Sequence, residues 1–192
     1  MKNLVTLLPY PDEVVVLGLT GKQVIEALEN GVSQYPKLEG RFPCVSGIRF
    51  EYDPSLPPGS RVIQDTVFVN GERIQLENKE YTVATKSYLA KGKDGYDVFQ
   101  QGRVIVDDED GPVLPNLVRN YFIMMEVVEA FQSKKYWDSQ ELVPSKSDET
   151  LLKVARCMIK RTKFKASHQT GSVDHRVCVS TKVDGRITRR SN

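Results

Sequence analysis

The chain has 192 residues, of which 40% are hydrophobic and 27% are charged, and its formal net charge is +2. These proportions are typical of a folded globular protein, and they exclude a disordered or low-complexity chain. The sequence has no run of about 18 apolar residues, so it predicts no membrane-spanning helix and no membrane partner.

The first part of the chain predicts two strands followed by a helix. Segments 4–10 and 13–21 are apolar and β-branched, and Pro9 and Pro11 at their junction predict a tight corner. Residues 20–36 then change to helical periodicity, with Thr20 as the expected N-cap and a proline at the end.

The middle of the chain predicts several strands of a sheet. Residues 40–54 alternate between apolar and polar side chains, which is typical of a half-buried strand. The Asn-Gly pair at 70–71 predicts a hairpin between strand patterns at 61–69 and 72–76. A further strand is predicted over 80–90, followed by a Gly-rich turn.

The last part predicts two helices and a final strand. The helices cover 113–132 and 145–165, and the strand covers 176–187, with a charged and frayed tail after it. This order of elements predicts an α+β fold, with mostly antiparallel mixed sheets covered by helices.

Positive charge is concentrated toward the C-terminus. Residues 1–133 carry 13 Lys and Arg against 19 Asp and Glu, whereas residues 134–192 carry 14 against 6. A basic segment can bind nucleic acid or an acidic membrane surface. Here the charges are spread among apolar residues at helical spacing, so we interpret them as a solvated surface and expect no nucleic-acid partner.

Motifs that carry chemistry are missing from the sequence. His168 and His175 lie seven residues apart without further ligands, and no phosphate-binding or dinucleotide-binding loop occurs. The acidic cluster 107–110 lacks the alternating oxygen ligands of a calcium loop and predicts a solvated turn. We therefore expect no catalytic residue and no metal ligand in this chain.

The cysteines also give no sign of a specialised site. Cys44, Cys157 and Cys178 are odd in number and widely spaced, which fits neither a disulfide framework nor a zinc site. We expect reduced thiols, although one pair could form a bridge. The lack of a disulfide pattern favours an intracellular protein.

Two tyrosines are candidates for ligand binding. Tyr10 lies between prolines at the end of a predicted strand, and Tyr96 follows Gly92 and Gly95 in the turn. A rigidly held aromatic ring can stack on a nucleobase, a contact that contributes about 1–3 kcal/mol. Two rings from separate loops could clamp a base between them; the alternative is that both simply pack inside the protein.

Three segments in register resemble the C-terminal domain of the 5′-nucleotidase family. They are LLPYPDEVVVLGLTGKQVIEALENGV, GRFPCVSGIRFEYD and YTVATKSYLAKGKDGYDVF, and the VDGRI sequence at 183–187 resembles the usual end of that domain. The resemblance implies a domain formed by residues 1–122 and 176–188. Residues 123–175 would then be a helical insert packed on it.

The resemblance also implies a function. It is that of a two-domain enzyme whose N-terminal metallophosphoesterase domain holds two divalent metal ions and hydrolyses a phosphate ester. The C-terminal domain binds the rest of the nucleotide, with the base between two aromatic rings. These rings match Tyr10 and Tyr96 here, and Asp94 and Gly95 belong to the same substrate-binding turn. We expect the metal-bearing domain and the start of the C-terminal domain to lie outside this chain, which would be inactive alone and prone to oligomerise.

The chain departs from the family pattern in three ways. Tyrosine replaces the usual phenylalanine at both aromatic positions, Lys93 replaces a glycine, and the predicted insert is longer than usual. These departures leave two alternatives open. The substrate could be a sugar phosphate or a nucleotide sugar, or the chain could be a non-catalytic binding module that kept the fold.

Overall fold

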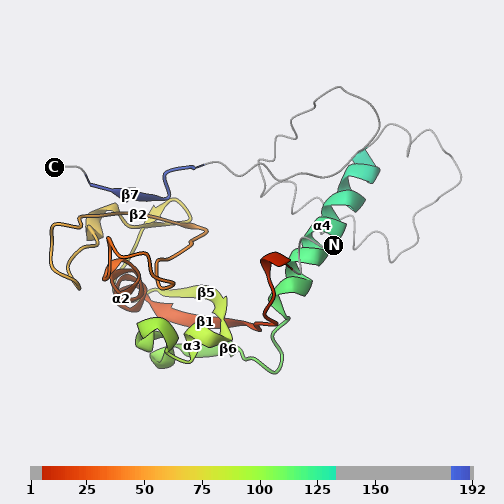
Figure 1. Cartoon of the computed structure of the whole chain (residues 1–192), viewed down its shortest axis with the longest axis horizontal. Helices are drawn as coiled ribbons and strands as arrows, with labels where there is room; N and C mark the ends of the chain where they lie inside the picture. Colours follow the sequence, from red (N-terminus) through yellow and green to blue (C-terminus); the bar gives the residue numbers. More distant parts are fainter. Residues whose placement is uncertain (1–5, 133–182, 191–192) are drawn as a thin grey trace, which may run out of the picture. The chain divides into compact units, whose positions relative to one another are not determined.

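A computed structural model describes residues 6–132 and 183–190 of the chain (Figure 1). The chain divides into two compact units, one formed by residues 2–116 and 181–192. This unit holds every strand in the described ranges. The described part of the other unit consists of helix α4 (Leu114–Gln132) from Leu117 onward. None of the described helices is long and apolar enough to cross a membrane.

The first sheet is antiparallel and has β1 (Val14–Thr20) at its centre. It is flanked by β5 (Glu80–Lys86) and β6 (Arg103–Val106). Alternation along β1 buries one face almost completely, because Leu17 and Leu19 are only 2% and 1% exposed.

The second sheet has the strand order β4–β3–β2–β7. Strand β2 (Ile48–Tyr52) pairs with a neighbour on each side. The predicted hairpin is confirmed, since Asn70 and Gly71 have φ values of 53° and 87°. Positive φ at both central residues gives a turn whose twist matches the strands it joins. The paired strands are shorter than predicted: β3 covers Phe68–Val69 and β4 covers Glu72–Arg73, while β7 (Ile187–Arg189) runs parallel to β2.

Helix α2 (Gly21–Val32) lies between the two sheets (Figure 1). Thr20 and Gln23 form a capping box at its start, which confirms the predicted N-cap. The hydrophobic core includes side chains from β1, α2 and β2, so this helix is covered on both sides. The α+β fold with mostly antiparallel mixed sheets is confirmed.

Two buried charged residues fix the C-terminal half of α2. The Glu29 carboxylate accepts hydrogen bonds from the backbone N–H groups of Arg61 (3.0 Å) and Val62 (2.7 Å). The Arg61 guanidinium donates to four carbonyl oxygens at 2.8–2.9 Å, and three of these belong to the end of α2 and the turn after it. The four carbonyls are those of Val32, Ser33, Tyr35 and Leu56.

Two predictions at the ends of the chain are wrong. In place of a strand over 4–10, Thr6 and Leu7 are helical and residues 8–10 form no regular element. The charged tail is not frayed at Thr188 and Arg189, because both belong to β7 and pair with β2. Strand β7 depends on pairing with β2, which is distant in sequence and which periodicity does not reveal.

Several predictions fall outside the described residues. The helix at 145–165, most of the strand at 176–187, both histidines and two of the cysteines lie there; Cys44 is free and exposed. The division into a domain of residues 1–122 plus 176–188 and an insert of 123–175 stays a prediction.

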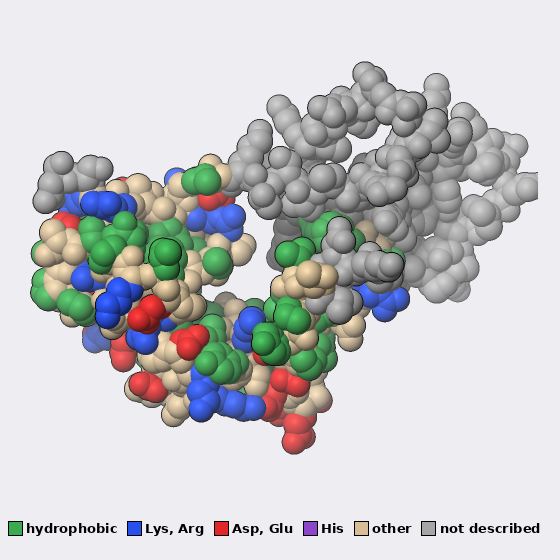
Figure 2. Space-filling model, viewed as in Figure 1, with side chains coloured by type: hydrophobic (Ala, Val, Ile, Leu, Met, Phe, Trp, Pro, Cys, Tyr) green, Lys and Arg blue, Asp and Glu red, His purple; other side chains and the backbone are tan. Residues whose placement is uncertain are grey.

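On the face shown in Figure 2, acidic and basic side chains are interspersed over the described surface without a large patch of one sign.

Candidate functional site

The candidate site lies at one end of the β5–β1–β6 sheet. Because β1 and β5 are antiparallel, the residues before β1 and those after β5 leave the sheet at the same end. Val14 lies opposite Lys86, and the Ser87 backbone N–H donates to the Glu13 carbonyl at 2.9 Å. We call this end, with the loops that join it, the tyrosine end of the sheet.

Two exposed aromatic rings leave from the tyrosine end. Tyr10 precedes β1 and is 72% exposed. Tyr88 lies in the one-turn helix α3 (Ser87–Ala90), directly after β5, and is 47% exposed. An ion pair of 2.6 Å between Lys86 and Asp12 links the two segments that carry the rings.

The acidic turn after β6 holds helix α3 in place. Asp108 accepts hydrogen bonds from Lys91 Nζ (2.7 Å) and from Ser87 Oγ (3.3 Å), one residue at each end of α3. The bond from Lys91 holds the pKa of the Asp108 carboxyl below its usual value. The segment is a turn, as predicted, but Asp108 also positions the helix that carries Tyr88.

The loop after α3 has an unusual backbone. Gly92, Asp94 and Gly95 all have left-handed φ values, of 77°, 56° and 78°. Aspartate adopts this conformation less readily than glycine, and such strained positions often mark functional sites. Asn30 of α2 fixes the loop by donating from Nδ2 to the Asp94 carbonyl at 3.0 Å. Arg41 donates in turn to Asn30 Oδ1 at 3.3 Å.

The Asp94 carboxylate is half-buried and retains free acceptor capacity. Its Oδ1 accepts a hydrogen bond from the Tyr88 hydroxyl at 3.2 Å. Its Oδ2 faces Gly40, where an added Cβ would lie 3.8 Å away. Within the described part of the chain, no Lys or Arg forms an ion pair with Asp94. A carboxylate in this state can accept further hydrogen bonds from a ligand hydroxyl.

The structure places the Tyr96 ring inside the protein, which is the alternative to base stacking that the sequence left open. Tyr96 is 5% exposed and stacks on Phe99 with ring centroids 5.1 Å apart. Its hydroxyl donates to the Arg41 carbonyl at 2.7 Å. Burial raises the pKa of Tyr96 to about 12, and the nearby charge of Asp94 adds to the shift, so the hydroxyl remains a donor.

Sequence reasoning missed Tyr88, the exposed ring nearest to Asp94. A signal was present in the alternation of β5, because Tyr81 is buried and the same period places Ser87 inside and Tyr88 outside. Among the predicted site residues, the side chain of Tyr10 is exposed and that of Asp94 is half-buried. Gly95 is exposed in the same loop as Asp94.

Replacing Gly95 with alanine is expected to lower the free energy of unfolding by about 1–3 kcal/mol. An added Cβ would meet the left-handed φ and would also lie 2.7 Å from Asn30 Oδ1. Urea denaturation followed by circular dichroism measures the change. Gly59→Ala is the matched control, because Gly59 has a φ of 90° with no atom within 4 Å of an added Cβ. Equal losses for the two variants would show that the approach to Asn30 contributes nothing.

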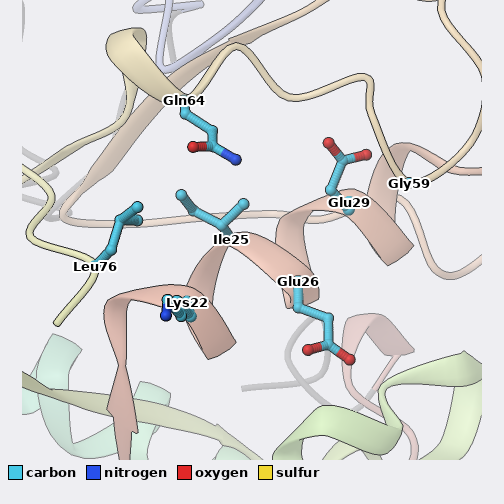
Figure 3. Close-up of a pocket in the computed structure, with 7 residues that line it drawn as sticks. All are labelled: Lys22, Ile25, Glu26, Glu29, Gly59, Gln64 and Leu76. Carbon is cyan, nitrogen blue, oxygen red and sulfur yellow. The ribbon is translucent and has the colours of Figure 1, made fainter.

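A separate pocket of about 330 Å³ lies against α2 (Figure 3). Two of its three charged residues already have partners within the protein: Lys22 pairs with Glu77 at 2.6 Å, and Glu29 binds the backbone of Arg61 and Val62. The third, Glu26, is exposed. The described residues contain no group of three or more His, Cys, Asp or Glu that could hold a metal ion. The tyrosine end therefore remains the better candidate for ligand binding. The pocket is lined by Lys22, Ile25, Glu26, Glu29, Gly59, Gln64 and Leu76.

Comparison with known proteins agrees with the resemblance seen in the sequence. Residues 1–101 match the family described as 5′-nucleotidase, C-terminal domain. The chain is 35% identical over 101 residues to the trifunctional nucleotide phosphoesterase protein YfkN of Bacillus subtilis (strain 168), a match that covers 52% of this chain and 7% of that protein. It is 30% identical over 131 residues to the 5′-nucleotidase of Diplobatis ommata, covering 66% of this chain and 22% of that protein.

The fold has a similar counterpart among solved structures. The crystal structure of the 5′-nucleotidase precursor from Thermus thermophilus aligns with a TM-score of 0.58 and 26% sequence identity. The alignment covers 98% of this chain and 27% of that protein, so the chain spans about a quarter of its length. The matched family, the similar sequences and the shared fold agree: the chain belongs to the family of 5′-nucleotidase C-terminal domains.

Proposed function

We propose that the chain is the substrate-binding portion of a two-domain, metal-dependent phosphomonoesterase that hydrolyses nucleotides to nucleoside and phosphate. The observation that carries this proposal is the tyrosine end of the sheet. Two exposed rings, Tyr10 and Tyr88, leave the same end of one sheet, and the half-buried Asp94 lies beside Tyr88 without an ion pair to any described residue.

These groups suit the two chemically different parts of a nucleoside. The π-faces of Tyr10 and Tyr88 can stack on a base, while the Asp94 carboxylate can accept a hydrogen bond from a sugar hydroxyl. Gly95 lets the loop backbone turn without a side chain at that point. Tyr96 supports the loop from inside and offers no free face to a base.

Hydrolysis itself would depend on a metallophosphoesterase domain as partner. Its two divalent metal ions would activate water and stabilise the phosphoryl oxygens. The residues of this chain would bind the nucleoside part and orient it toward that domain. Alone, the chain is expected to bind nucleosides without hydrolysing phosphate esters.

The test is an NMR titration of the ¹⁵N-labelled chain with adenosine, uridine, ribose 5-phosphate and glucose 6-phosphate. Nucleosides are expected to shift the resonances of Tyr10, Tyr88 and Asp94, and the sugar phosphates are not. The chain is also expected to release no phosphate from AMP in the presence of Mg²⁺ or Mn²⁺. Shifts caused by sugar phosphates alone would favour a sugar-phosphate phosphatase, and phosphate release would contradict the assigned role.

A further inference from the structure

The hydroxyl of Tyr88 is directed at the group proposed to bind the sugar. It donates to Asp94 Oδ1 at 3.2 Å, and this is the only hydrogen bond to the Asp94 carboxylate within the described ranges. The negative charge of Asp94 raises the pKa of Tyr88, and the hydrogen bond between them acts in the same direction. The phenol therefore stays protonated and keeps its role as a donor.

The side chain of Asp94 needs such a contact because only its backbone is otherwise fixed. Asn30 holds the Asp94 carbonyl, and the left-handed φ sets where the side chain starts. Rotation about χ1 and χ2 would still let the carboxylate swing into solvent. The hydrogen bond from Tyr88 restrains that rotation and leaves Oδ2 on the side of Gly40. A pre-oriented acceptor loses less conformational freedom when a ligand binds.

We propose that the hydroxyl of Tyr88 positions Asp94 for a ligand hydroxyl, a role separable from the stacking of its ring that the proposed function already assumes. The proposal rests on the proposed function, because it assumes a ligand with a flat ring and a sugar. Tyr88 is thus a positioning residue for sugar recognition in addition to a stacking platform.

The experiment separates the two roles with two ligands. Dissociation constants are measured by NMR titration for adenosine, which has a base and a sugar, and for adenine, which has only the base. Tyr88→Phe is expected to weaken adenosine binding about three- to tenfold, the usual effect of one hydrogen bond, and to leave adenine binding unchanged.

A double-mutant cycle tests the coupling. Asp94→Asn keeps a residue that tolerates the left-handed conformation, and it is expected to weaken adenosine binding by at least the same factor. The double variant is expected to bind adenosine no more weakly than Asp94→Asn alone. Tyr121→Phe is the matched control, because the Tyr121 hydroxyl makes no hydrogen bond in the described structure, and it should change neither constant.

The outcomes distinguish this inference from the proposed function. If Tyr88→Phe binds adenosine like the unaltered chain while Asp94→Asn binds it more weakly, the inference is overturned and the proposed function stands. If Tyr88→Phe weakens the binding of adenine and of adenosine equally, the hydroxyl affects binding of the base rather than of the sugar. The inference is then also overturned. If the unaltered chain binds neither ligand, the proposed function fails and the inference fails with it.

Discussion

Replacing Arg61 with alanine is expected to lower the free energy of unfolding by about 3–5 kcal/mol. Arg61 is only 9% exposed, and its guanidinium donates to four carbonyl oxygens. Three of these belong to the last turn of α2 and the segment after it, where carbonyls have no partner within the helix. Alanine would leave these buried acceptors without donors and would open a cavity beside them.

Urea denaturation followed by circular dichroism measures this loss. The stability of Arg61→Lys is expected to fall between those of the unaltered chain and Arg61→Ala. The lysine ammonium group keeps the positive charge but lacks the planar guanidinium, whose N–H groups reach several acceptors at once. Arg73→Ala is the matched control: Arg73 also donates to a backbone carbonyl, that of Asp65, but its side chain is 60% exposed. A loss at Arg61 no larger than that at Arg73 would contradict the prediction.

The same interaction links stability to the candidate site. Arg61 fixes the C-terminal end of α2, and Asn30 in that part of the helix holds the Asp94 carbonyl. We therefore expect the position of the loop that carries Asp94 to depend in part on Arg61, which lies outside that loop.

Local patterns were sufficient to predict part of the unit formed by residues 2–116 and 181–192, although β6 and the one-turn helix α3 were not predicted. The β-branched run of β1, the Thr20 cap and the Asn-Gly hairpin each specify their conformation within a few residues. Pairing across the chain was harder to foresee. Strand β7 exists because Ile187 pairs with Phe50, which lies more than a hundred residues earlier, and nothing in the tail itself indicates that partner.

The residues of the candidate site could be singled out from the sequence in part, and the inward position of Tyr96 has a physical cause. The glycines around Asp94 do mark an unusual loop, but the left-handed turns direct Tyr96 inward, where its hydroxyl reaches Arg41. The orientation of a side chain after such a turn depends on packing against α2, which the sequence does not show. The exposed ring comes instead from Tyr88, earlier in the chain, in a helix of one turn.

Replacing Tyr88 with alanine is expected to weaken adenosine binding about 5- to 150-fold, because it removes both the stacking ring and the hydroxyl that contacts Asp94. The free energy of unfolding should change little, since the ring is 47% exposed. Dissociation constants from NMR titration and urea denaturation of the same variant measure the two effects.

Tyr96→Ala provides the contrasting variant. Its ring is 5% exposed and stacked on Phe99, so its removal is expected to lower the free energy of unfolding by about 3–5 kcal/mol. Tyr96→Leu keeps most of the buried volume but removes the aromatic face, and it should bind adenine with unchanged affinity because the Tyr96 ring has no free face. Unchanged adenosine binding in Tyr88→Ala would contradict the assignment of Tyr88. Weaker adenine binding in a folded Tyr96→Leu variant would return the stacking role to Tyr96, and would mean that the loop turns this ring outward when ligand binds.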